Sequence, residues 1–230
     1  MFVLNYESID ISGFAGIRER VLVMDRNYFS RHVADEVRDG FGACVYLAHA
    51  YFTPGGSTGL HYHKDVDIIS IFTKGEVQHQ GTLGDGTHFF PGQVLVQCSG
   101  ENGFRHNEMN ALDDISGMVQ IWCEPSDTSA LTQRHEVIDV NALGVHRVYG
   151  GTQEDALTNI PHTTQFDLAV MSDGQEIKLA QQNRLYVLAG EVLVQEEQAS
   201  QILKRGSLCD GRQLHIKANT AAKVLIITQV

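Results

Sequence analysis

Proline, cysteine and long apolar runs are all scarce in this chain of 230 residues. Its four prolines contrast with 22 glycines, a balance typical of short strands joined by tight turns. No apolar run reaches the length of a membrane span, and the first residues lack a basic segment followed by an apolar one. The cysteines form no C-x-x-C pair, so we expect buried free thiols and no disulfide framework at Cys44, Cys98, Cys123 and Cys209. We therefore expect a cytoplasmic protein that does not associate with membranes.

Basic charge is also scarce, because the formal net charge is −11. Nucleic acids and anionic membranes are bound by basic surfaces, so direct binding to either is not expected. An acidic surface still allows a protein partner. No G-x-S-x-G motif and no phosphate-binding glycine loop is present, which excludes serine hydrolases of that type and P-loop nucleotide binders.

Helical periodicity is weak along the chain, whereas strand patterns are frequent. Short segments rich in β-branched and aromatic residues are bounded by glycine-containing turn signals. These segments predict strands at 21–24, 43–52, 67–73, 76–80, 94–97, 117–123, 147–149, 166–171, 184–189, 191–196, 213–217 and 222–228. Their number and spacing favour an all-β jelly roll.

The strand pattern of the first half recurs faintly in the second half. Residues 184–194 are similar to residues 69–79, including the Gly-Glu turn. A polar connecting segment follows Pro125. We therefore predict two tandem domains, 1–125 with a functional site and 126–230 as a degenerate copy.

Two dyads in the first half point to a metal site. His61 and His63 are separated by one residue, as are His106 and Glu108, and such pairs project from one face of a strand. Eleven histidines make one H-x-H unremarkable, but two dyads in one apolar-strand context are much less expected by chance. Three imidazoles and a carboxylate suit Fe(II), Mn(II), Ni(II) or Zn(II), and an octahedral ion would keep two positions open. The second half offers only His215 near the corresponding place, so we predict that it binds no metal.

Other polar residues are weaker candidates. His79 lies on a strand whose alternate residues could reach the site, and a structural role is as plausible as one behind the metal ligands. His88 and His135 have no partner at metal-ligand spacing. Cys98 shortly precedes the second dyad, but a small core residue is the favoured interpretation. Tyr62 has the opposite strand phase and should point away from the site.

The dyads and their surroundings resemble the pirin family of the cupin superfamily. The segments that carry the resemblance lie between residues 39 and 123 and read HYHKDVDIISIFTKGEVQH, PGQVLVQ and GFRHNEM. The resemblance implies two cupin domains and one metal, most often iron. Its ligands would be the two histidines of H-x-H and the histidine and glutamate of H-x-E, here His61, His63, His106 and Glu108. Tyr62 replaces the usual proline and Asp67 a glutamate, which alters the wall of the pocket.

The resemblance also implies a function. Some bacterial pirin relatives are quercetin 2,3-dioxygenases, so we expect an Fe(II)-dependent dioxygenase acting on a flavonol or a similar hydroxy-carbonyl compound, with Mn, Ni, Zn or Cu as alternative metals. Glu108 would be the catalytic residue, either staying on the metal or accepting the substrate hydroxyl proton. The substrate, dioxygen and a possible protein partner complete the expected interactions of a monomer. The alternative is a redox-sensing or regulatory protein that acts through a protein partner.

Overall fold

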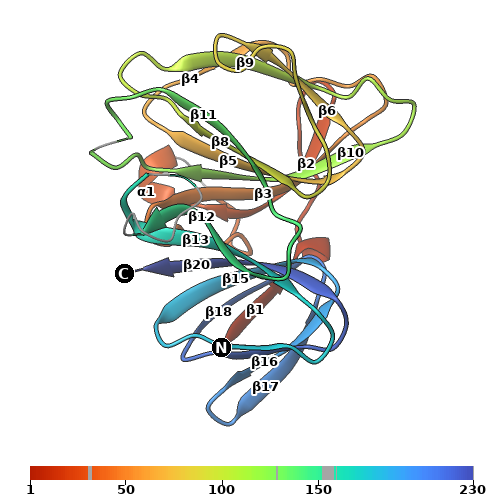
Figure 1. The fold of residues 1–230 in the computed structure, drawn as a ribbon, viewed down its shortest axis with the longest axis vertical. Coiled ribbons are helices and arrows are strands. Elements are labelled where there is room, and N and C mark those ends of the chain that lie inside the picture. Colours follow the sequence, from red (N-terminus) through yellow and green to blue (C-terminus); the bar gives the residue numbers. More distant parts are fainter. Residues whose placement is uncertain (31–32, 128, 152–157, 159, 230) are drawn as a thin grey trace. The chain divides into compact units, whose positions relative to one another are not determined.

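The computed structural model describes residues 1–230 except 31–32, 128, 152–157, 159 and 230. The regular secondary structure of the described chain is almost entirely β-strand, as predicted, and the chain divides into two compact units (Figure 1). The N-terminal unit comprises Ile9–Asp139, and the C-terminal unit comprises Met1–Ser8 with Val140–Val230. No helix in the described part of the chain has the length and apolarity that a membrane span needs.

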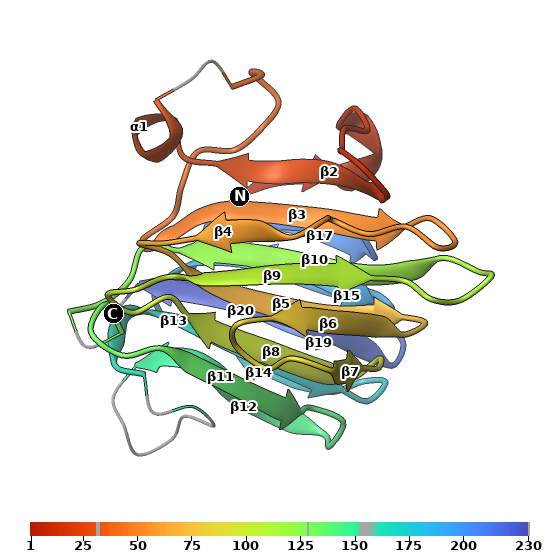
Figure 2. The same ribbon diagram turned by 90° about the horizontal axis from the view of Figure 1, so that it is seen from above.

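The N-terminal unit is a jelly roll of two antiparallel sheets. A four-stranded sheet of order β4-β9-β6-β7 lies over a six-stranded sheet of order β11-β8-β5-β10-β3-β2 (Figure 2). Its elements are β2 (Ile17–Met24), α1 (Arg26–Phe29), β3 (Cys44–Phe52), β4 (His61–His63), β5 (Asp67–Lys74), β6 (Val77–Gly81), β7 (Thr87–Phe89), β8 (Gln93–Cys98), β9 (Phe104–Met109), β10 (Ser116–Cys123) and β11 (Arg134–Asp139).

The C-terminal unit is also a jelly roll of a six-stranded and a four-stranded sheet. The sheet orders are β1-β18-β15-β20-β13-β12 and β14-β19-β16-β17. Its elements are β1 (Phe2–Asn5), a 3-10 turn (Tyr6–Ser8), β12 (Gly144–Gly151), β13 (His162–Met171), β14 (Glu176–Lys178), β15 (Gln182–Ala189), β16 (Glu191–Glu196), β17 (Ala199–Lys204), β18 (Ser207–Arg212), β19 (His215–Ala218) and β20 (Ala222–Gln229).

The two units repeat one topology, as the recurring sequence pattern predicted. Residues 184–194, which were predicted to match residues 69–79, form β15 and β16. These strands occupy the same positions in their sheet orders as β5 and β6 do in theirs. Each of these hairpins turns on a glycine with positive φ, 67° at Gly75 and 77° at Gly190. A Cβ at Gly75 would lie 2.7 Å from Ser116 Oγ, and one at Gly190 only 2.2 Å from the carbonyl oxygen of Ala221. Both the backbone conformation and the available space therefore require glycine at this turn.

The bounds of the units differ from the predicted division at residue 125. Strand β11 lies beyond that position but pairs with β8, from Arg134 opposite Cys98 to Asp139 opposite Gln93. At the other end of the chain, β1 pairs with β18 and so belongs to the C-terminal unit, where Figure 1 shows it in red among blue strands. Each six-stranded sheet thus gains its last strand from a segment that the sequence pattern assigned to the other domain.

The interiors of the two units differ in polarity. The C-terminal interior is a continuous aliphatic cluster that includes Val192, Val194, Ile216 and Ala218. The N-terminal unit has a comparable apolar cluster, in which Phe72 and Phe89 stack with ring centroids 4.5 Å apart. Buried polar residues occupy another part of its interior, and they include all the predicted site residues except the half-buried His61.

Candidate metal centre

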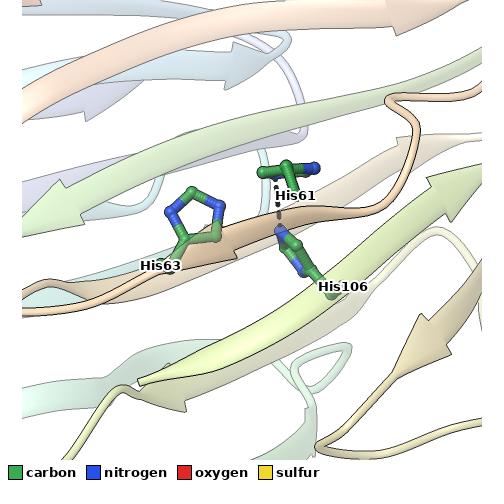
Figure 3. A group of neighbouring side chains, drawn as sticks. All are labelled: His61, His63 and His106. Carbon is green, nitrogen blue, oxygen red and sulfur yellow. Dashed lines mark hydrogen bonds between the residues drawn. The ribbon is translucent and has the colours of Figure 1, made fainter. Parts of the chain in front are cut away.

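Strands β4 and β9 bring the three predicted histidines together. The strands are antiparallel neighbours, with His61 directly opposite His106 and His63 opposite Phe104. Strand β4 ends after His63 because the chain turns at Asp65, whose φ is 56°. One ligand nitrogen from each of His61, His63 and His106 lies within 4.8 Å of the other two (Figure 3). The site suggested by the sequence spacing is therefore assembled by cross-strand pairing.

Hydrogen bonds assign the protonated nitrogen of His61. Its Nδ1 lies 2.8 Å from the carbonyl oxygen of Gly59, and because a carbonyl can only accept, Nδ1 carries the proton. In the neutral ring, Nε2 is then left as a bare lone pair. The tautomer is inferred from the hydrogen-bond partner, as is usual for histidine.

A second histidine assigns the tautomer of His106. His79 Nδ1 donates to the carbonyl oxygen of Gly84 at 3.0 Å, so neutral His79 presents a bare Nε2. This Nε2 lies 3.3 Å from His106 Nδ1 and the same distance from Gln97 Nε2. His106 therefore donates through Nδ1 and turns a bare Nε2 towards His61. Histidines that bind metals commonly have their second nitrogen held in this way.

The two bare nitrogens approach each other closely. His61 Nε2 and His106 Nε2 are 3.1 Å apart, the contact drawn as a dashed line in Figure 3. Two lone pairs at this distance repel unless a cation lies between them. Nitrogen ligands about 2.1 Å from a metal and at right angles to each other are separated by about 3 Å. The third nitrogen, His63 Nε2, is buried without a hydrogen-bond partner. The arrangement fits one divalent metal ion.

Burial keeps the imidazoles of His63 and His106 neutral. His63 is 7% exposed, and desolvation together with the neighbouring His61 lowers its pKa to about 3. His106 is fully buried, and the same two kinds of effect lower its pKa far below the usual value. Only a neutral imidazole can bind a metal, so burial prepares both side chains as ligands.

Glu108 lies close to the histidine triad but is not part of the group of three. It follows His106 by two residues on β9, with the same inward orientation, and it is opposite His79 on β6. Its Oε2 accepts a hydrogen bond of 3.2 Å from Gln120 Nε2, whereas its Oε1 is buried without a hydrogen-bond partner. Desolvation raises the pKa of the carboxyl to about 7, partly opposed by the Gln120 hydrogen bond.

Three aromatic rings line the side of the site next to His63. The indole of Trp122 lies edge-on to His63 at 5.2 Å and tilted against Tyr46 at 5.0 Å. Phe29 lies 6.0 Å from Trp122 and is supplied by α1, a single turn that Asp25 caps by accepting hydrogen bonds from two backbone amides. We refer to Phe29, Tyr46 and Trp122 as the aromatic wall.

Two inward-facing residues of β10 at the aromatic wall are partly exposed to solvent. Strand β10 is flanked on both sides by β3 and β5, and Val119 and Ile121 are fully buried. Gln120 and Trp122, on the opposite face of the strand, are nevertheless only half-buried, as is His61. Gln120 also reaches Glu108 inside the jelly roll, so a partly exposed side chain contacts a buried residue of the candidate site.

The weaker candidates from the sequence lie in different places in the structure. His79 lies directly behind His106, whereas His88 is on the outer face, 2.6 Å from Glu76 Oε1. The ring of His135 lies 5.5 Å from His79, and both of its nitrogens are buried without a hydrogen-bond partner. Cys98 is fully buried, and burial raises its pKa far above the usual value, as in an inert core thiol. Gln97, Gln120 and Trp122 were not predicted; the only signal was a glutamine in each of the apolar strands β8 and β10.

The predicted consequence of the His79 contact is a loss of metal affinity in His79→Leu. Without an acceptor at His106 Nδ1, the ring loses its preference for the tautomer with a bare Nε2. We expect affinity to fall by about 10–100-fold, the usual effect of removing a partner behind a metal ligand. Competition with a chromogenic chelator measures this change. His146→Leu is the control, because His146 also hydrogen-bonds a carbonyl oxygen, that of Ala142, but lies in the other unit. Equal affinities of both variants would contradict the assignment.

Comparison with known proteins agrees with this geometry. Residues 26–123, which include all four predicted ligands, match the family model described as Pirin. The chain is 25% identical over 193 residues to a protein named quercetin 2,3-dioxygenase from Escherichia coli O157:H7, covering 81% of this chain and 82% of the relative. A pirin-like protein of Caulobacter vibrioides is 37% identical over 65 residues, 28% of each chain.

Solved structures share the whole fold. The nickel(II) complex of the bacterial pirin YhhW from Escherichia coli superposes with a TM-score of 0.81 at 18% identity, covering 99% of this chain and 98% of that one. A quercetin 2,3-dioxygenase from Acinetobacter baumannii gives a TM-score of 0.70 at 17% identity, covering 100% and 85%. The segment 26–123 thus matches the Pirin family model, and the whole chain has the fold of the bacterial pirin structure.

Proposed function

We propose that this protein is a dioxygenase of the quercetin 2,3-dioxygenase type that uses one divalent metal, Fe(II) in the first instance. Its substrate would be a flavonol or a similar aromatic hydroxy-carbonyl compound. The observation that carries the proposal is the convergence of three imidazoles, with the Nε2 atoms of His61 and His106 3.1 Å apart. The relatives named quercetin 2,3-dioxygenase support the choice of reaction.

The proposed ligands are His61, His63 and His106 through Nε2, with Glu108 as the fourth. When bound, the metal would supply Lewis acidity and open positions for substrate and dioxygen. Glu108 contributes a carboxylate whose Oε1 has no hydrogen-bond partner and can bind the metal or accept a proton. The donor set of three imidazoles and one carboxylate is compatible with several metals, so the choice of iron rests on the family resemblance.

The aromatic wall suits a planar substrate. A flavonol has fused aromatic rings, which pack favourably against the faces and edges of aromatic side chains. Trp122 lies beside His63 at 5.2 Å, so a ring held against it would lie close to the ligand nitrogens. We expect the wall to orient the substrate and to exclude water from its apolar face.

The direct test is turnover by metal-loaded protein. Metal-free protein is reconstituted separately with Fe(II), Mn(II) and Ni(II), and quercetin loss is followed by absorbance together with dioxygen uptake. We expect consumption of both reactants in proportion to metal content. Fully loaded protein that consumes neither quercetin nor other flavonols would contradict the proposed activity and favour the redox-sensing alternative.

Glu108→Gln separates proton transfer from metal binding. The amide keeps the shape of the side chain and an oxygen for the metal, but it cannot accept the substrate proton. We expect quercetin turnover per bound metal to fall by at least about 100-fold, within the range for loss of a general base, with a smaller effect on metal content. Glu101→Gln, an exposed position just before β9, is the control. Parallel losses of metal and turnover would make Glu108 a ligand only.

We further propose that the C-terminal unit binds no metal and has a structural role. The inward-facing residues of β19 are Ile216 and Ala218, both buried in the aliphatic cluster. His215 faces outwards and lies 3.1 Å from Glu176 Oε2, with Lys217 beside the same carboxylate. Metal analysis of the whole protein should therefore find about one ion per chain.

A further inference from the structure

Two hydrogen bonds connect the aromatic wall to the carboxylate of Glu108. Trp122 Nε1 donates to Gln120 Oε1 at 3.0 Å, and Gln120 Nε2 donates to Glu108 Oε2 at 3.2 Å. Trp122 and Gln120 are two residues apart on β10, so both side chains face into the jelly roll, towards β9. The connection therefore spans from one sheet to the other.

The chemistry of the two ends determines the orientation of the Gln120 amide. An indole N–H can only donate, so it must face the amide oxygen. An ionised carboxylate can only accept, so it must face the amide NH₂ group. A flipped amide would place two donors together at Trp122 and two acceptors together at Glu108. Both contacts thus require the same orientation, which is also the orientation in which Nε2 lies 3.5 Å from Ser70 Oγ.

The two oxygens of Glu108 are in different surroundings. Oε2 is held by Gln120, while Oε1 is buried and has no hydrogen-bond partner. A carboxylate without this contact could rotate and exchange its oxygens, or bind a metal through both of them. With Oε2 engaged, only Oε1 keeps its full capacity as a ligand.

We propose that Gln120 is the positioning residue for Glu108 and that Trp122 sets the orientation of Gln120. The Gln120 amide holds Oε2 so that Oε1 alone is presented to the metal, and the Trp122 indole prevents the amide from flipping. This inference rests on the metal site of the proposed function, but not on its substrate or reaction. The same indole forms part of the aromatic wall, so a ligand that displaces Trp122 would also loosen the carboxylate.

The experiment measures metal affinity and the geometry of the site in the absence of any flavonol. Co(II) is bound to metal-free protein, its affinity is obtained by chelator competition, and its visible absorption spectrum reports the ligand arrangement. We expect Gln120→Leu to lower the affinity by about 10–100-fold and to change the spectrum. In Trp122→Phe the ring against His63 remains but the N–H is lost, so we expect a smaller loss in the same direction.

A double-mutant cycle distinguishes positioning from packing. In a Glu108→Ala background, Gln120→Leu should change Co(II) affinity by less than about twofold, because its effect acts through the missing carboxylate. Trp122→Phe should likewise have little effect in a Gln120→Leu background. A residue that only fills space would cause the same loss with or without Glu108.

Gln78→Leu is a matched control for the substitution. Gln78 lies on β6 and its Nε2 also donates to a carboxylate, Glu76 Oε1, at 3.2 Å, but this carboxylate contacts His88 and is not one of the proposed metal ligands. Gln78→Leu should leave Co(II) affinity and the spectrum unchanged.

If circular dichroism shows that Gln120→Leu does not fold, the more conservative Trp122→Phe replaces it in the double-mutant cycle with Glu108→Ala. Unchanged Co(II) binding in both variants, or equal losses with and without Glu108, would overturn the proposal. These Co(II) measurements do not depend on flavonol turnover, so a protein without that activity would still test the role of Gln120.

Discussion

Replacing His61 by alanine is expected to release the metal while the protein stays folded. The change removes one of the three converging nitrogens and leaves the buried His63 and His106 with an incomplete site. The loss should exceed the 10–100-fold typical of residues behind a ligand. His61 is only half-buried, so its removal should disturb packing little. Metal per chain after dialysis, measured by inductively coupled plasma mass spectrometry, should fall from about one to near zero.

His106→Ala and His88→Ala complete this test. His106 is fully buried, so its replacement should also release the metal but at some cost in stability, which thermal unfolding measures. His88 is an outward-facing histidine paired with Glu76, and its replacement should leave the metal content unchanged. Wild-type protein that stays metal-free after reconstitution, or a His61→Ala protein with a full equivalent, would refute the metal site.

The metal-free protein is expected to lose stability as the pH falls from 7 to 5. His63 has a pKa of about 3 in the folded protein against 6.5 ordinarily, and the pKa of His106 is also strongly lowered. At a pH between the folded and the unfolded pKa, these histidines bind protons in the unfolded chain but not in the folded one. Their contribution to the free energy of unfolding is therefore fully present above about pH 6.5 and decreases as the pH falls. At pH 5 each of the two imidazoles lowers the free energy of unfolding by about 2 kcal/mol relative to pH 7.

Glu108 opposes this trend. Its pKa is raised from 4.5 to about 7. The contribution of Glu108 to the free energy of unfolding is therefore present at low pH and is lost as the pH rises towards 7. Between pH 7 and pH 5 this gain roughly cancels the loss from one imidazole. His79 and His135 also have lowered pKa values and add to the loss of stability in acid, so the protein is still expected to be less stable at pH 5 than at pH 7. Urea unfolding of chelator-treated protein at pH 7, 6 and 5 measures this difference. His106→Leu should flatten the dependence and His88→Leu should not. A metal-free protein equally stable at pH 5 and 7 would contradict the buried, neutral state of these histidines.

Local sequence patterns predicted most of the strands. Each of the twelve predicted strands overlaps a strand of the structure, because their β-branched and aromatic residues occupy buried positions. The six strands that neither the patterns nor the dyads suggested are short or largely polar: β1, β7, β11, β14, β17 and β18. Their pairing depends on partners distant in the chain, such as β1 on β18, which no local pattern encodes. For the same reason the division at residue 125 missed the real bounds of the units.

The candidate metal ligands could be predicted from the sequence because their spacing fixes which face of a strand they occupy. Alternation along a strand places His61 with His63, and His106 with Glu108, on one face whatever the rest of the fold. Cross-strand pairing then decided that the two dyads meet, with His61 opposite His106. The protonated nitrogens were decided by carbonyl oxygens and by His79, for which the sequence left a structural role and a role behind the ligands equally open.

What the sequence by itself determined is thus most of the strand content, the duplication and the choice of candidate metal ligands, all of which depend on residues near one another in the chain. Only the tertiary structure decided which segments complete each sheet, which histidine supports His106 and how Gln120 reaches Glu108. These depend on contacts between strands from different parts of the chain, as between β10 and β9. Hydrogen bonds across the interior of a jelly roll require a donor and an acceptor that folding brings together, so the sequence can suggest one partner but not the pairing.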